Sequence, residues 1–350
     1  METLQSGAVV SRRCSELVRD LIKPNSSIYL TDFLASFSIG LLSFLVFQSS
    51  LDSLVSIIAG SLAGLALYRC SVFIHEIQHH SDKDLGIFPQ IWNSMFGIPF
   101  LMPIFLYGEH STHHSMLTYG TQKDPEYPRL KSKRMLHFTA LMALGFVYPL
   151  LGPLRFAVIT PLAIICPDID RFVYTRLSSL YNIKIGYKRP LDASAKSASR
   201  WFQEITCCLW AWTWIGLGLV GLVDTGFFLK TYIVFALWML INQLRTLAAH
   251  RYNSGGLVGD HLSQLLDTNT FDRGWATTAW APVGLRYHAL HHLLPKLPYH
   301  NLELAHNRII KSLPVDSPYH KTIKRGLRYA IRQNFVEKEG KTTRETSQER

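Results

Sequence analysis

Four apolar segments, each about as long as a membrane-spanning helix, constrain the fold of this chain most strongly. A helix that crosses the hydrocarbon core of a bilayer needs roughly 20 consecutive apolar residues. Residues 29–48 and 51–70 meet this requirement as one pair, and residues 204–222 and 227–249 as a second pair. Within each pair only a short turn separates the segments. The sequence therefore predicts an all-α integral membrane protein with four transmembrane helices in two hairpins.

Two further apolar stretches contain residues that interrupt helices. Residues 85–107 include Pro89, Pro99 and Pro103, and residues 135–166 include several prolines and an arginine. Because proline removes a backbone donor and kinks a helix, we expect neither stretch to cross the membrane in full. Both are predicted to lie at the membrane interface, the second as an interfacial or re-entrant hairpin.

The distribution of basic residues predicts the orientation. Arg12, Arg13, Arg19 and Lys23 precede the first span, whereas the hairpin turns are nearly free of basic residues. Since basic residues favour the cytoplasmic side, a multi-pass protein with cytoplasmic termini is expected. The membrane would be the plasma membrane in a bacterium and the endoplasmic reticulum in a eukaryote.

The domain organisation follows from the same pattern. Residues 1–28 form a polar, cytoplasmic N-terminal segment, residues 29–336 a single membrane domain, and residues 337–350 a polar tail that is expected to be disordered. The net charge of +11 suits an anionic lipid surface, a phosphorylated acyl carrier or an acidic protein partner. Nucleic acid is not expected as a partner, because no basic stripe is interleaved with aromatic residues.

Three histidine stretches carry the chemistry: HEIQHH at 75–80, HSTHH at 110–114 and HALHH at 288–292. Histidines three or four residues apart share one face of a helix, so each stretch can direct its imidazoles to a common point. Buried imidazoles without partners are costly, and a metal ion is a partner to several at once. Zinc is usually satisfied by four ligands, so eight or nine imidazoles fit two metal ions better than one. Imidazole suits iron, copper, nickel and zinc alike, which leaves the metal open.

The three stretches, in this order and with a long second gap, resemble the membrane-bound fatty acid desaturase family over residues 75 to about 305. The resemblance implies two non-haem iron ions in a cytoplasmic helical cap and O2 as co-substrate, reduced to water. It implies a fatty acyl substrate, carried by CoA, acyl carrier protein or a lipid, into which a C=C bond is introduced. It also implies a separate electron donor, such as ferredoxin or cytochrome b5 with its reductase.

The last predicted span ends in Thr246-Leu247-Ala248-Ala249-His250. Some acyl desaturases similarly carry Asn-x-Ala-Ala-His at this point, so the resemblance implies His250 as a ninth ligand, with Thr246 in place of the Asn. The predicted ligands are His75, His79, His110, His113, His114, His250, His288, His291 and His292. Further candidates, as ligands or as partners of ligands, are His80, His261, Thr246, Glu76, Asp124 and Asp260. The histidines without a partner in a motif are not expected to be ligands; they are His137, His300, His306 and His320.

Two other functions remain open from the residues alone. A hydroxylase or ketolase of a lipid or carotenoid could use the same metal centre, because the motifs do not separate oxygen insertion from desaturation. A metal transporter or a haem-binding membrane protein would instead need ligands near the middle of the spans. The three histidine stretches fall outside the four central apolar segments, which argues against this class.

Overall fold

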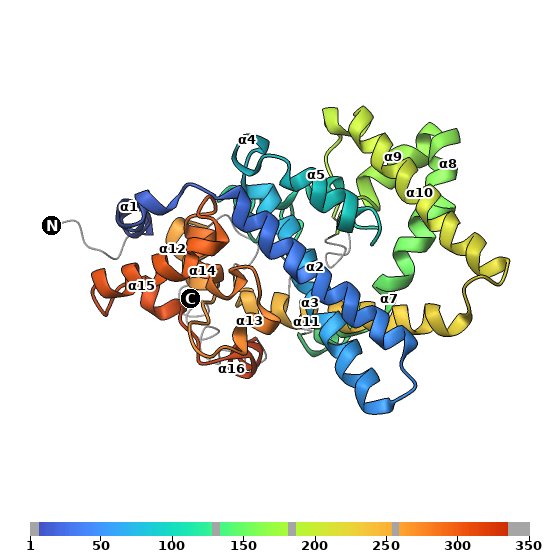
Figure 1. Ribbon diagram of the computed structural model, residues 1–350. Helices are drawn as coiled ribbons and strands as arrows, with labels where there is room; N and C mark the ends of the chain where they lie inside the picture. Colours follow the sequence, from blue (N-terminus) through green and yellow to red (C-terminus); the bar gives the residue numbers. More distant parts are fainter. Residues whose placement is uncertain (1–6, 128–133, 181–186, 254–258, 335–350) are drawn as a thin grey trace, which may run out of the picture.

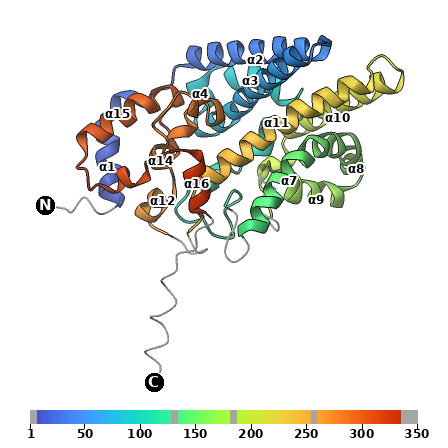
Figure 2. The same cartoon turned by 90° about the horizontal axis from the view of Figure 1, so that it is seen from below.

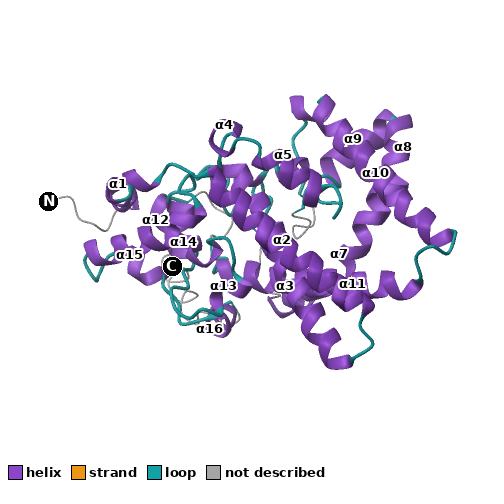
Figure 3. Cartoon of the chain, in the orientation of Figure 1, coloured by secondary structure: helices purple, strands orange, loops and turns teal. Residues whose placement is uncertain are grey.

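The computed structural model describes residues 7–127, 134–180, 187–253 and 259–334. These residues are almost entirely helical, and their only extended pairings are two isolated bridges (Figures 1 and 3). The prediction of an all-α protein is therefore confirmed. The tail for which disorder is predicted, residues 337–350, lies outside the described residues.

Helices α2 (Ser26–Ser49) and α3 (Ser53–His79) form an antiparallel hairpin at the positions predicted for the first two spans. Each begins with a capped end, because Asn25 and Asp52 accept hydrogen bonds from backbone amides of the first turn. The 27 residues of α3 rise about 40 Å, which exceeds the roughly 30 Å of a hydrocarbon core. One end of α3, which carries His75 and His79, can therefore project beyond the apolar layer.

Four helical segments of the described chain are long and apolar enough to cross a membrane: Ser26–Ser49, Ser53–His79, Phe138–Ile165 and Thr225–Ala249. The last is α11, which matches a predicted span. Phe138–Ile165 covers the stretch whose prolines predict an interfacial hairpin, and α10 (Ala198–Leu219), at the predicted span 204–222, is not in the group. The set thus differs from the predicted one in one member, and the two-hairpin arrangement stays a prediction.

Local structure accounts for both differences. Helix α7 (Arg134–Pro153) continues through a π-helical turn at Leu154–Ile159 into α8 (Thr160–Ile165), and this wider turn accommodates the prolines without ending the helix. Helix α10 begins with polar residues, including Gln203 and Glu204, that are buried inside the protein. Proline content therefore underestimates how far the helix at 138–165 continues, whereas the polar residues at the start of α10 lower its mean hydropathy.

A buried ion-pair network ties α10 to the π-helical turn. Arg155 donates two hydrogen bonds to Glu204, from Nη1 to Oε2 at 2.9 Å and from Nη2 to Oε1 at 2.6 Å. Arg200, one turn before Glu204, donates to Asp170 of α9 (Pro167–Arg176) at 2.5 Å. Because both arginines are buried, each depends on its carboxylate partner.

We predict that Arg155→Met lowers the free energy of unfolding by about 3–5 kcal/mol, because the buried Glu204 carboxylate would lose its bidentate partner and keep only Thr160 and a longer contact with Arg200 at 3.4 Å. Chemical unfolding in detergent, followed by circular dichroism, measures the change. The double variant Arg155→Met/Glu204→Leu removes both charges and should regain most of the loss. A single variant as stable as the unmodified protein would contradict this account.

The remaining α-helices are short and lie mostly on one side of the long helices, as Figures 1 and 2 show for α1, α12, α14, α15 and α16. They are α1 (Gly7–Leu17), α4 (Asp82–Leu85), α5 (Phe88–Trp92), α6 (His110–His114), α12 (His261–Asp267), α13 (Thr277–Trp280), α14 (His288–Leu293), α15 (Leu302–Ser312) and α16 (Leu327–Gln333). No helix described between residues 85 and 107 reaches the length of a span. It stays a prediction that this stretch lies at the membrane interface. It also stays a prediction that the short helices, with the histidine motifs, lie in the cytoplasm.

Candidate metal centre

Two groups of histidines lie where the ends of α3 and α11 meet α6 and α14. His75, His79, His110, His114 and His291 form the first cluster, and His113, His250, His288 and His292 form the second. Within each cluster the ligand nitrogens all lie within 4.8 Å of one another. The structure thus brings together all nine histidines proposed as ligands.

The first cluster depends on two pairs at helical spacing. His75 and His79 are one turn apart on α3, and His110 and His114 are one turn apart on α6, so each pair presents its rings on one face. His291 of α14 completes the group, with its ring centroid 4.4 Å from that of His75 and 4.5 Å from that of His79.

The second cluster is assembled around His250, which directly follows α11. Its Nε2 lies 3.2 Å from Nε2 of His113 and 2.8 Å from Nε2 of His288. His292, one turn after His288 on α14, has its Nε2 3.1 Å from Nε2 of His288. All four side chains are buried.

Carboxylates and a tyrosine hold several of these rings from behind. Asp124 lies 3.0 Å from Nδ1 of His113, and Glu126 contacts Nδ1 of His110. Nδ1 of His250 lies 2.9 Å from the hydroxyl of Tyr119, and this hydroxyl donates to Asp267 at 2.8 Å. Such partners fix the orientation of a ligand ring and increase its basicity.

Electrostatics keep most of these rings neutral. Burial lowers the pKa of His114, His288 and His292 well below the usual range, and neighbouring histidines lower it further. His113 is the exception, because the nearby Asp124 and Glu126 carboxylates outweigh burial and raise its pKa. A neutral imidazole has a free lone pair at neutral pH, which is the form that binds a metal.

The hydrogen bonds test whether the clusters suit metal ions. Because Tyr119 gives its proton to Asp267, His250 must donate through Nδ1 and so presents a bare Nε2. His113, held by Asp124 through Nδ1, turns its Nε2 to the same point. These two nitrogens lie 3.2 Å apart and can bind one cation together, which fits metal ligation. In the first cluster both ring nitrogens of His75 and Nε2 of His79 are buried without a hydrogen-bond partner, so these residues also fit metal ligation.

Four of the other candidate residues lie outside the clusters, and one of them, Asp124, supports a ligand. Asp124 is a partner of His113, as described above. Glu76 accepts hydrogen bonds from Tyr29 and from the backbone amide of Tyr299, and His80 contacts the same Tyr29 hydroxyl. Thr246 donates to the carbonyl of Asn242 inside α11. None of these four residues belongs to either cluster.

Asp260 and His261 lie at the beginning of α12 and belong to neither cluster. Asp260 caps this helix through Ser263, and His261 is exposed. His300, His306 and His320, which have no partner in a motif, are also outside the clusters. The side chain of His137 is not among those that the structure describes.

Sequence reasoning missed Tyr119, Gln264 and Asp267. The side-chain amide of Gln264 lies 3.2 Å from Nδ1 of His292, and Asp267 also accepts from Tyr127 at 2.8 Å. Asp267 is distant from every histidine motif in the sequence, so spacing held no signal for it. Its position at the end of α12 brings it beneath His250.

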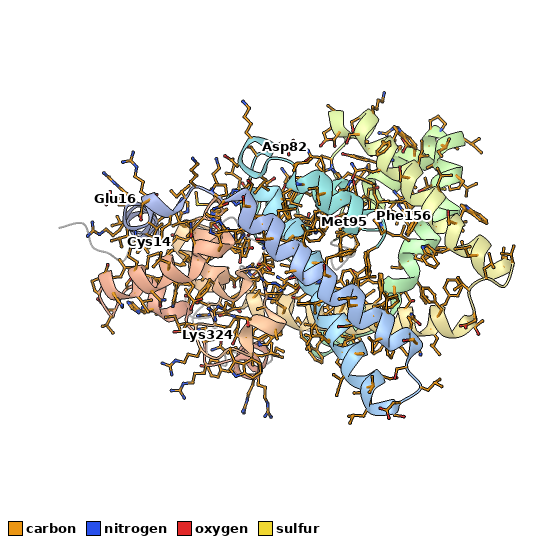
Figure 4. The ribbon with its side chains drawn as sticks, viewed as in Figure 1. Cys14, Glu16, Asp82, Met95, Phe156 and Lys324 are labelled. Atoms are coloured by element: carbon orange, nitrogen blue, oxygen red, sulfur yellow. The ribbon has the colours of Figure 1, made fainter. Side chains whose placement is uncertain are left out.

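An apolar cavity of about 820 Å³ adjoins the first cluster, and His75 and Glu126 are in its wall. Its size is within the range of cavities that enclose a small ligand, roughly 300–1,000 Å³. Most of the lining is apolar or aromatic and comes from α2, α3, α7, α10 and α11. Met95 and Phe156, labelled in Figure 4, also line the cavity, from the π-helical turns at Asn93–Gly97 and Leu154–Ile159. A hydrocarbon chain in this cavity would approach the histidines.

Comparison with known proteins agrees with the histidine pattern. The fatty acid desaturase family model matches residues 52–323, which is more than half of the chain. The chain belongs to the fatty acid desaturase family. It is also 37% identical to a ceramide hydroxylase from Caulobacter vibrioides (strain NA1000 / CB15N) over 340 residues, which cover 95% of this chain and 94% of the relative. No solved structure matches it.

The family match and the ceramide hydroxylase relative together point to an oxidoreductase. The family match and the four apolar helices point to a membrane protein. The two histidine clusters are compatible with a pair of non-haem metal ions. The family is described by desaturation and the relative by hydroxylation, so oxygen insertion fits this chain as well as desaturation does.

Proposed function

We propose that the protein hydroxylates an aliphatic carbon of a ceramide-type lipid, with O2 as oxidant. The observation that carries this proposal is the 37% sequence identity to a ceramide hydroxylase along nearly the whole of both chains. The two histidine clusters and the apolar cavity beside them agree with it. One oxygen atom would enter the C–H bond. The other would leave as water, after uptake of two electrons and two protons from outside the protein.

The proposed cofactor is a pair of iron ions, one held by each cluster. When bound, they would supply the oxidising power that breaks an unactivated C–H bond, which no protein side chain can do by acid–base chemistry. His75, His79, His110, His114 and His291 would hold one ion, and His113, His250, His288 and His292 the other. Asp124 and Tyr119 would keep His113 and His250 in the tautomer that presents Nε2.

The protein's own contribution is to position the lipid and exclude water. Phe37, Phe44, Trp214 and Phe227 are among the aromatic side chains of the cavity wall, while His75 is in the wall beside the clusters. A hydrocarbon chain bound along this wall would bring one carbon next to the centre. The apolar surroundings would also limit the access of water to a reactive intermediate.

Desaturation of a fatty acyl chain is the second candidate, and membership of the fatty acid desaturase family favours it. In this reaction two hydrogens leave adjacent carbons and both oxygen atoms end as water. The same ligands and the same cavity would serve it. The two reactions differ in where the substrate is held once the first hydrogen has been removed.

We also propose the partners and the location that either reaction needs. Ferredoxin, or cytochrome b5 with its reductase, would deliver the electrons, because the described part of the chain has no cluster of cysteines for an iron–sulfur centre. The positive net charge of +11 suits an acidic carrier of this kind. The centre would face the cytoplasm, with the protein in the plasma membrane of a bacterium or the endoplasmic reticulum of a eukaryote.

We predict that a host expressing the protein accumulates ceramides that have gained one oxygen atom. Mass spectrometry of the lipids, in cells with and without the gene, measures this change. Ceramides or acyl chains that have instead lost two hydrogen atoms would support desaturation. Unchanged lipids, in cells whose purified protein holds two irons per chain, would contradict both reactions.

A further inference from the structure

One guanidinium group in the cavity wall, that of Arg245, has no described carboxylate within ion-pair distance. Arg245 lies near the end of α11, five residues before His250, and is in the cavity wall with His75 and Thr246. Its Nη2 donates to Oδ1 of Asn242 at 2.9 Å, and it also faces the hydroxyl of Tyr68. Its Nε is buried and has no hydrogen-bond partner.

Other inward-facing arginines that the structure describes are neutralised. Arg155 pairs with Glu204, Arg200 with Asp170, Arg189 with Glu109 and Arg69 with Asp32. Within the described residues, no carboxylate oxygen lies within ion-pair distance of Arg245. Since an ionised side chain at the end of a membrane helix is costly without an opposite charge close to it, an arginine at this position points to a ligand.

The position of Arg245 makes this cost larger. Its charge acts on the rings of His75 and His250, one from each cluster, and also on the Glu126 carboxylate in the same cavity wall, which is beyond ion-pair distance. A cation beside a site for two metal ions opposes the binding of those ions. Packing alone therefore does not account for an arginine at this position. An electron-rich group of the substrate, held between Arg245 and the centre, would offset the repulsion.

The chemistry of this group can be specified. Arginine has N–H donors and no acceptor, so its ligand must present an acceptor oxygen. The rest of the cavity is mostly apolar, which suits a neutral lipid whose polar end is at Arg245 and whose tail extends along the aromatic wall. In an acylated lipid, the acceptor nearest the hydrocarbon chain is the carbonyl oxygen of the acyl linkage.

We propose that Arg245, held by Asn242, binds the carbonyl oxygen of the acyl linkage and so determines which carbon is oxidised. This inference rests on the proposed function, because it assumes that the lipid occupies the cavity beside the metal centre. It follows that oxidation occurs within a few carbons of the linkage. It also follows that an amide-linked lipid binds better than an ester-linked one, because an amide oxygen is the stronger acceptor.

The test compares Arg245→Met, which keeps much of the length but loses all donors, with Arg245→Lys, which keeps the charge. Binding is measured on metal-free protein in detergent, with ceramide and with a diacylglycerol of the same acyl chains as probes. We expect Arg245→Met to weaken ceramide binding about 10- to 100-fold, the usual effect of losing hydrogen bonds to a charged group. Arg245→Lys should recover part of this loss, because lysine keeps the charge but not the planar fork of donors.

The second measurement is the position of the new oxygen, from fragmentation of the product. Unmodified protein should give one position close to the linkage, and Arg245→Met several positions further along the chain, with KM raised more than kcat is lowered. Arg273→Met, which removes an exposed arginine outside the cavity, is the matched control and should change neither measurement.

Two results separate this inference from the proposed function. If Arg245→Met binds ceramide as tightly as the unmodified protein, or gives the same single product, Arg245 has no such role, even though lipid oxidation stands. If no lipid is oxidised but ceramide binds and Arg245→Met weakens that binding, the reaction is wrong and the carbonyl site stands. Should Arg245→Met fail to fold, Arg245→Lys decides the matter through ceramide affinity and product position.

Discussion

Replacing His113 by alanine is expected to reduce the iron content from two ions per chain to one or none and to abolish product formation. His113 belongs to the four-histidine cluster, so its loss leaves too few imidazoles to complete a four-coordinate site. It also leaves Asp124 buried without its imidazole partner. Metal analysis of the purified protein and lipid mass spectrometry of the expressing host measure the two effects.

His261→Ala is the matched control for this experiment. His261 is exposed at the beginning of α12 and lies outside both clusters, although its sequence position makes it a candidate ligand. We expect this variant to hold two irons and to form product at the unmodified rate. If His113→Ala kept both irons and full activity, or if His261→Ala lost them, the assignment of the nine ligands would be wrong.

Asp124→Asn is expected to lower metal affinity about 10- to 100-fold, with a corresponding loss of activity at limiting iron. An amide has nearly the shape of the carboxylate but no charge, so it gives weaker support to Nδ1–H of His113. Tyr119→Phe should have a similar effect, because it removes the hydroxyl that accepts from Nδ1 of His250 and donates to Asp267. The two variants test opposite sides of one cluster.

Titration with a chelator, followed by the iron remaining on the protein, measures these affinities. Asp82→Asn, at an exposed carboxylate on α4, should release iron at the same chelator concentration as the unmodified protein. Equal retention by Asp124→Asn and Tyr119→Phe would mean that these groups do not support the ligands. In that case the contacts behind His113 and His250 would serve packing only.

The same ligand set can serve hydroxylation and desaturation, so the outcome of the reaction depends on how the lipid is held. The cavity wall, rather than the histidine motifs, is where the two reactions would be separated. Arg245 is the cavity arginine with no described carboxylate within ion-pair distance, which makes it the first position to test. A shift in product position on its replacement would connect substrate binding to the choice of carbon.

Several features of this protein follow from local sequence alone. Apolar segments of sufficient length predict helices α2, α3 and α11, and a spacing of four residues predicts the histidine pairs that share a cluster. These features depend on neighbours in the chain, so periodicity reveals them. The same locality explains why proline content is misleading at 138–165, where a π-helical turn absorbs the interruptions. The expectation that pairs three residues apart also meet at one point is wrong: His110 and His113, like His288 and His291, are divided between the two clusters.

Only the tertiary structure decided how the nine histidines divide. Adjacent residues in a helix point about 100° apart, so His113 and His114 enter different clusters although they are neighbours in the sequence. Which cluster each one enters depends on where α3, α11 and α14 lie around α6. The support of His250 by Asp267, and the lack of an acidic partner for Arg245, likewise depend on contacts between distant segments. Such contacts are fixed by packing and charge pairing across the fold, and no spacing in the sequence encodes them.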